Sequence, residues 1–110
     1  MTIYIIQGRY TEQAIKGMVA KPEDRASEAA KLAEASGTKM LNYFVTFGEY
    51  DFLVIMEGDD NVATMSALFA AASKGGVTDL RTTVAVTTRD ARAAMEKAGA
   101  IARKYRAAGS

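Results

Sequence analysis

Four stretches of the chain have the composition and the two-residue alternation of β-strands. Residues 2–10 are rich in β-branched and aromatic side chains, and every second position of 38–47 is apolar from Leu41 onward. Residues 52–57 open with five consecutive apolar side chains and are therefore expected to be buried on both faces. Residues 77–87 alternate again, which predicts a fourth strand.

Helical patterns lie between these strands. Thr11 is expected to cap a short helix, and a second helix is predicted to begin with Pro22 as its first residue and to end at Gly37. Alanines recur along that second helix at three- and four-residue spacing, which would let it lie close on a sheet. A third helix is predicted over 61–73. Its apolar side is expected to comprise Val62, Met65, Leu68, Phe69 and Ala72.

A terminal helix is predicted to follow Thr87, which can cap it with Asp90 near the third position. We expect this helix to dock an alanine-rich stripe and to hold its basic residues near its C-terminus. The 110 residues contain no linker-like segment, so 1–87 and the helical segment 88–110 are predicted to form one domain. The apolar stripe comprises Ala91, Ala94, Met95, Ala98, Ala102 and Tyr105.

The order β-α-β-β-α-β predicts an α+β fold of ferredoxin-like type, with a four-stranded antiparallel sheet and two helices on one face. The strands at 2–10 and 52–57 should be central. The second face then needs the terminal helix, a ligand pocket or the sheet of another subunit. We favour a facing sheet, which makes a second copy of the chain the expected partner.

Charge and composition narrow the range of possible functions. Fourteen Lys and Arg residues against thirteen Asp and Glu give a formal charge of +1, so no general attraction to nucleic acid or anionic lipid is expected. The chain has no cysteine and no histidine, which excludes an imidazole base, thiolate chemistry and His or Cys metal ligands. No cofactor, metal, signal peptide or membrane span is predicted, and the cytoplasm is the expected location.

A tight turn, Phe47-Gly-Glu-Tyr-Asp51, joins the second and third strands. Gly48 is expected to supply the backbone angles of the turn, and Asp51 to accept hydrogen bonds from turn amides. For Gly48 and Asp51 this structural role is preferred to ligand contact. For Tyr50, a plug at a dimer edge and a ligand contact are equally compatible with the sequence.

These residues resemble those of the GYD domain family. The resemblance spans residues 2 to about 90. It includes an N-terminal Tyr-Ile strand, Gly48-Glu-Tyr-Asp51 before an apolar strand, and Arg81-Thr-Thr83. It implies a dimeric α/β-barrel-type, ferredoxin-like bacterial protein, in a family without an assigned biochemical role. Further matching positions are Thr11, Gly17, Pro22 and Arg25.

The stretch from Tyr43 to Val86 is also similar to the effector-binding half of Lrp/AsnC-type regulators, which bind small molecules such as amino acids between subunits. The first strand begins almost at Met1, so DNA binding is expected to need a partner. The similarity implies a ligand site at a subunit boundary. The candidate ligand-binding residues are Gly48, Glu49, Tyr50, Asp51, Arg81, Thr82 and Thr83.

Three alternative functions are compatible with the sequence. The first is a homo-oligomeric small-molecule-binding or assembly module that uses the Gly48–Asp51 turn. The second is an enzyme with Asp51 or Glu49 as base and Tyr50 or Arg81 as electrostatic partner. The third is a regulatory partner of another protein. For Arg81, an ion pair with Glu49, Asp51 or Glu57 is preferred to a ligand contact.

Overall fold

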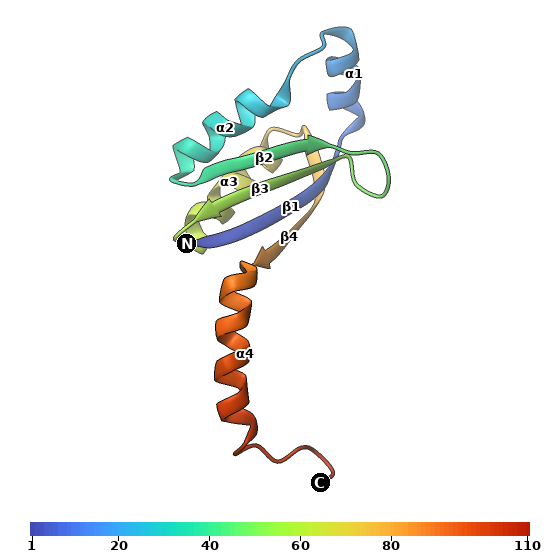
Figure 1. Cartoon of the computed structure of the whole chain (residues 1–110). Helices are drawn as coiled ribbons and strands as arrows, with labels where there is room; N and C mark the ends of the chain where they lie inside the picture. Colours follow the sequence, from blue (N-terminus) through green and yellow to red (C-terminus); the bar gives the residue numbers. More distant parts are fainter.

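The computed structural model describes residues 1–110 and contains four strands and four helices (Figure 1). The elements follow the predicted order, and the terminal helix comes last. The strands are β1 (Thr2–Tyr10), β2 (Lys39–Val45), β3 (Phe52–Gly58) and β4 (Val77–Ala85). The helices are α1 (Glu12–Ala20), α2 (Arg25–Ser36), α3 (Asn61–Ser73) and α4 (Thr88–Ala102).

The four strands form one antiparallel sheet in the order β2-β3-β1-β4, so β1 and β3 are central as predicted. Helices α2 and α3 lie over the same face, and the core is buried between them and the sheet (Figure 1). This arrangement confirms the α+β, ferredoxin-like fold. The buried strand residues on that face are Tyr4, Ile6, Phe52, Val54 and Met56.

Both edge strands are irregular. In β2 the extra residue Leu41 interrupts the pairing with β3, and in β4 two residues, Asp79 and Leu80, stand opposite Gly8 of β1. Asp79 has a φ of 52°, in the left-handed region that aspartate tolerates better than most residues. Each edge of the sheet therefore carries a β-bulge.

Helix α2 begins at Arg25, so the prediction that Pro22 is its first residue is wrong. The cap is Asp24, whose carboxylate accepts a hydrogen bond of 2.9 Å from the backbone N–H of Ala26. An aspartate at this position satisfies one of the first N–H groups of the helix, which have no partner within the helix itself. The predicted end is confirmed, because Gly37 adopts a φ of 85° directly after the helix.

The buried face of α3 differs from the predicted one. Thr64 and Ala67 are buried against the sheet, whereas Val62, Met65 and Phe69 are 71%, 53% and 68% exposed. Small side chains occupy the sheet-facing side, and larger ones lie on the outside. Because α3 contains no charged residue, its sequence does not mark a solvent face.

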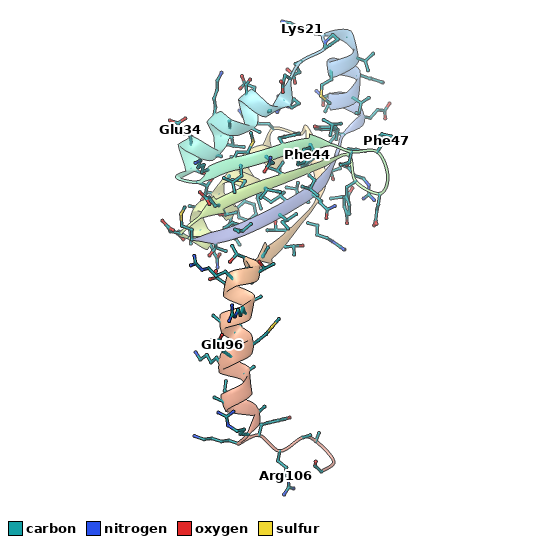
Figure 2. The ribbon with its side chains drawn as sticks, viewed as in Figure 1. Lys21, Glu34, Phe44, Phe47, Glu96 and Arg106 are labelled. Atoms are coloured by element: carbon teal, nitrogen blue, oxygen red, sulfur yellow. The ribbon has the colours of Figure 1, made fainter.

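Helix α4 extends away from the domain and has no buried residue (Figure 1). Its side chains, including Glu96, project into solvent all round (Figure 2). The radius of gyration is consequently 18.1 Å, against ~13 Å for a compact domain of about 100 residues. The prediction that α4 docks its alanine stripe is wrong within a single copy. None of the helices has the length and apolar content that crossing a bilayer requires.

The second face of the sheet, called here the open face, is covered by no helix. It carries Ile3 and Ile5 of β1 and Leu53 and Ile55 of β3, all half-buried, and the exposed Phe44 of β2 (Figure 2). Since α4 points away from the sheet, it does not shield these side chains.

Candidate ligand-binding site

The turn between β2 and β3 is attached to the central strand β1. Asp51 accepts a hydrogen bond of 2.9 Å through its carboxylate from the backbone N–H of Tyr10, and its own N–H donates to the carbonyl of Gly8. The Asp51 carboxylate therefore bonds to β1 and not, as expected, to the turn, whereas its backbone carbonyl accepts from the N–H of Thr46. Gly48 does not adopt a positive φ, so it does not supply the special angles expected of it. The turn itself is held by Thr46, whose hydroxyl donates to the carbonyl of Tyr50.

Replacement of Asp51 tests this attachment. Asp51→Ala leaves the Tyr10 N–H without its acceptor, and we expect the free energy of unfolding to fall by about 1–2 kcal/mol. Asp51→Asn keeps an acceptor oxygen and should lose clearly less. Urea unfolding of both variants measures the difference, and equal losses would show that the charge, not the hydrogen bond, matters.

Tyr50 and Arg81 meet on the open face. The Arg81 guanidinium lies 5.9 Å from the centre of the Tyr50 ring, and the Arg9 guanidinium lies 5.0 Å from it. Arg9 also pairs with Asp79 at 3.5 Å, whereas Arg81 makes no ion pair. The predicted pairing of Arg81 with Glu49, Asp51 or Glu57 is therefore wrong, and a cation–π contact takes its place.

The seven candidate residues do not converge on one site. Thr83 stands opposite Ile5 and shares the open face with Arg81, but Thr82 stands opposite Ile6 and faces the helices. Glu49 is exposed in the turn, so it lacks the burial that a catalytic base of its type needs. Ligand contact by these residues stays a prediction.

A cavity of 370 Å³ lies between the sheet and helices α2 and α3. Fifteen of its nineteen lining residues are hydrophobic, and the volume lies within the ~300–1,000 Å³ usual for ligand pockets. Alanines of both helices border it, so the small side chains expected to bring a helix close to the sheet also leave a hollow. The lining includes Ile6, Ala29, Leu32, Phe52, Ala71 and Leu80.

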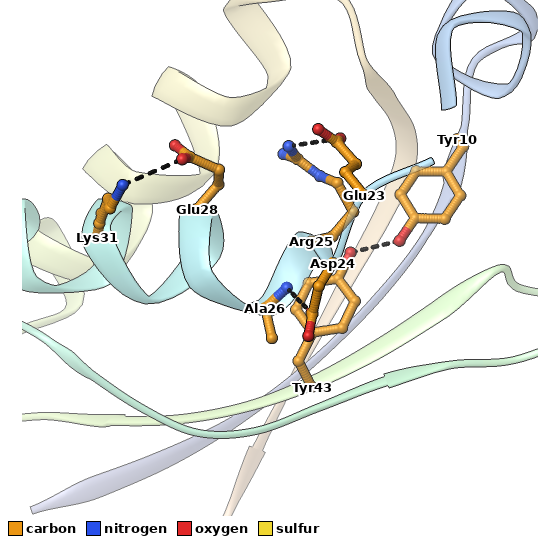
Figure 3. A network of polar contacts seen from close by, with 8 residues as sticks. All are labelled: Tyr10, Glu23, Asp24, Arg25, Ala26, Glu28, Lys31 and Tyr43. Atoms are coloured by element: carbon orange, nitrogen blue, oxygen red, sulfur yellow. Dashed lines mark hydrogen bonds and ion pairs between the residues drawn. The ribbon is translucent and has the colours of Figure 1, made fainter. Parts of the chain in front are cut away.

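Polar groups stand where the cavity is lined by α2, β2 and the end of α3. Arg25 forms an ion pair of 3.0 Å with Glu23, and Glu28 pairs with Lys31 at 3.2 Å (Figure 3). Lys74 follows α3 and makes no ion pair. The polar lining residues are Arg25, Glu28, Tyr43 and Lys74.

Two tyrosines join β1 to β2 beside these groups. The hydroxyls of Tyr10 and Tyr43 are hydrogen-bonded, and both rings pack on Phe52, with ring centres 5.1 and 6.0 Å away (Figure 3). Burial raises the pKa of the Tyr43 phenol, and the hydrogen bond and charge of Tyr10 raise it further, while Arg25 opposes the shift. Tyr43 is therefore a neutral hydrogen-bonding group at physiological pH.

The raised pKa of Tyr43 predicts alkaline sensitivity. The unfolded phenol ionises near its ordinary pKa of 10.0, whereas the folded one holds its proton to higher pH. The associated stabilisation is complete below pH 10 and is lost as the pH rises through the folded pKa. Urea unfolding between pH 9 and 11 should show a smaller alkaline loss for Tyr43→Phe than for the native chain, and parallel curves would refute this.

An open groove of 790 Å³ adjoins the cavity, because Arg25 and Tyr43 line both. It runs beneath the segment between α1 and α2 and includes Tyr10, Pro22 and Asp51. Asp51 is thus the one candidate from the turn that borders this region. The sequence does not single out Arg25 or Tyr43 as a pair, since they meet only when α2 packs over β2.

The fold places the chain among ferredoxin-like α+β proteins. The model of the GYD domain family matches residues 4–95, and the chain belongs to that family. A comparison with curated proteins finds no match.

Two solved structures are similar. The crystal structure of FFRP-DM1 is 18% identical and covers 78% of this chain and 100% of its own, with a TM-score of 0.48. A hypothetical protein, PHS023, from Pyrococcus horikoshii is 17% identical and covers 79% of this chain and 92% of its own, also with a TM-score of 0.48.

Proposed function

We propose that this GYD domain protein is a homo-oligomeric binding module whose small-molecule ligand occupies the cavity beneath α2 and α3. The observation that carries the proposal is an apolar hollow of ligand size with a few polar groups in its wall. The site differs from the one expected from the sequence, because the cavity and the Gly48–Asp51 turn adjoin only through the groove that Asp51 borders.

The ligand class follows from the lining. Apolar side chains favour a hydrocarbon or aromatic body, since burying such a body removes apolar surface from water. Arg25 and Lys74 are the cations of the lining, and Lys74 has no carboxylate partner. An acidic group at one end of the ligand would complete that pairing, with Tyr43 near enough to share in its hydrogen bonding.

Calorimetric titration with decanoate tests this proposal, with decanol and decylamine as neutral and cationic counterparts of equal length. We expect decanoate to bind most tightly and decylamine least. Lys74→Gln should weaken the binding of decanoate and leave the binding of decanol unchanged. Equal binding of the three probes would show that the cations do not select the ligand. If none of the three binds, the proposal is refuted.

A pair of alanine variants locates the bound probe. Ala29 borders the cavity, so Ala29→Leu should fill it and weaken decanoate binding about tenfold, a loss of about 1.4 kcal/mol. Ala35 lies exposed on the same helix, and Ala35→Leu should bind as the native chain does. Thermal unfolding checks that both variants fold. Equal affinities would place decanoate outside the cavity.

The oligomer belongs to the same proposal. The open face presents Ile5, Leu53 and Ile55 in a continuous apolar row across the central strands, and a second sheet would bury it. Ile55→Lys should therefore reduce the mass measured by light scattering at micromolar concentration. Val19→Lys, at an exposed position of α1, should not. A native chain that is already monomeric would refute this part.

A further inference from the structure

Helix α3 presents an uncovered apolar stripe to the outside. Val62, Met65, Phe69 and Ala72 follow one another at intervals of three, four and three residues, and all four are exposed. This spacing puts them along one line of the helix, opposite the buried Thr64 and Ala67. A helix that is apolar on all sides is normally buried, so α3 needs a cover on its outer side.

Helix α4 also carries an apolar stripe that no other element covers. Ala91, Ala94, Ala98 and Ile101 recur at the same three-four-three spacing, and α4 buries none of them. An isolated helix of fifteen residues is marginal in water without a packing partner. Two unpartnered stripes of the same period, one with large and one with mostly small side chains, are therefore present in one chain.

The C-terminal segment also differs in charge from the rest of the chain. Residues 88–110 hold six basic and two acidic residues, a formal charge of +4, whereas residues 1–87 hold eight basic and eleven acidic residues, a formal charge of −3. Asp59 and Asp60 precede α3, and Lys74 follows it. Arg103 and Lys104 follow α4. A contact that places the end of α4 at the start of α3 therefore joins two acidic residues to two basic ones. At its other end Lys74 meets a mixed set, Arg89, Asp90 and Arg92.

That orientation is antiparallel, and it needs a second copy. The last residues of β3 and β4 pair with the first residues of β1, so α3 and α4 both begin at the same end of the sheet. If α4 folded back over its own α3, the two helices would run parallel and Arg103 and Lys104 would approach Lys74. In the structure α4 does not fold back (Figure 1).

We propose that α4 of one copy packs antiparallel on the outer face of α3 of a second copy, an exchange that an isologous pair makes twice. Phe69 then faces Ala94, Met65 faces Ala98, and Val62 faces Ile101, so large side chains meet mostly small ones. The inference shares with the proposed function the need for a second copy, but it uses neither the cavity nor the open face.

The absence of native cysteine makes disulfide trapping specific. The full-length variants Val62→Cys and Ile101→Cys are refolded together, one of them with a size-altering affinity tag, and oxidised. We expect the mixed disulfide as the main product, seen as a shift from monomer to dimer on a non-reducing gel. Ala91→Cys in place of Ile101→Cys should leave the chains monomeric, because antiparallel packing puts Ala91 at the other end of α3.

Three results would overturn the proposal. A stronger product with Ala91→Cys would mean parallel helices, a dominant disulfide between two Ile101→Cys chains would mean that α4 pairs with α4, and no mixed disulfide would mean that the helices do not meet. Met65→Cys with Ala98→Cys repeats the trap one turn further along, with Ala100→Cys, on the far side of α4, as its negative control. Decanoate binding to the native chain and the effect of Ile55→Lys on its mass report the proposed function separately.

Discussion

Phe52→Ala should reduce the free energy of unfolding by about 3–5 kcal/mol, as expected when a large aromatic side chain is removed from a core. Phe52 is 4% exposed and packs between the rings of Tyr10 and Tyr43. Its loss would join new empty space to the cavity that it already lines. Urea unfolding followed by far-ultraviolet circular dichroism measures the change.

Phe47→Ala is the matched control, because the same side chain is removed from a position that is 102% exposed (Figure 2). We expect a change within about 0.5 kcal/mol, as for most surface substitutions. A loss for Phe52→Ala no larger than that of the control would mean that the sheet and helices pack differently around the cavity.

Gly8→Ala should reduce the free energy of unfolding by about 1–3 kcal/mol, the usual cost of overpacking a core. A Cβ at Gly8 would lie 2.7 Å from a side-chain carbon of Leu80 and equally close to the Phe52 ring. Neither neighbour can withdraw easily, because Phe52 is buried and Leu80 packs against the core. Thermal and urea unfolding both measure this loss.

Gly17→Ala should change the free energy of unfolding in the opposite direction. Gly17 lies inside α1, and a Cβ there would meet no atom within 4 Å. Alanine should therefore stabilise the helix by up to about 1 kcal/mol. If Gly8→Ala leaves the unfolding midpoint unchanged or raises it, the close approach of β1, β3 and β4 around Gly8 is incorrect. A lower midpoint for Gly17→Ala would contradict only the expected gain in α1.

The architecture could be predicted because several local signals agree. The apolar run of 52–56 indicates a central strand, and Thr11 and Gly37 mark helix boundaries. Thr87 caps the terminal helix, since its hydroxyl accepts a hydrogen bond from the N–H of Asp90. These signals depend on near neighbours in the chain. They hold in the structure because no tertiary contact opposes them.

The faces of the helices could not be predicted in the same way. In α3 no charge distinguishes outside from inside, and the close approach of the sheet selects Thr64 and Ala67 over the larger Met65 and Phe69. Alanines of α2 are equally compatible with tight packing and with a hollow. Which of these occurs depends on the distance between the layers, which the spacing of residues in one helix does not report.

The candidate site could not be predicted from the sequence for the same reason. The turn was found from its sequence, but its residues separate in space: Tyr50 turns toward Arg9 on the open face, and Asp51 bonds to Tyr10 at the end of β1. Arg25 and Tyr43 are eighteen positions apart in sequence and belong to different elements. Their association is a product of tertiary packing.

The two β-bulges hinder the pairing of edge strands between copies of the chain. Regular edge strands offer free N–H and C=O groups to a neighbour and promote fibrous aggregation. The extra residue Leu41 in β2 and the left-handed Asp79 in β4 break that regular spacing at both margins. Endless growth of one sheet across molecules is thereby disfavoured, so the edges of this sheet are poor templates for amyloid-like ribbons.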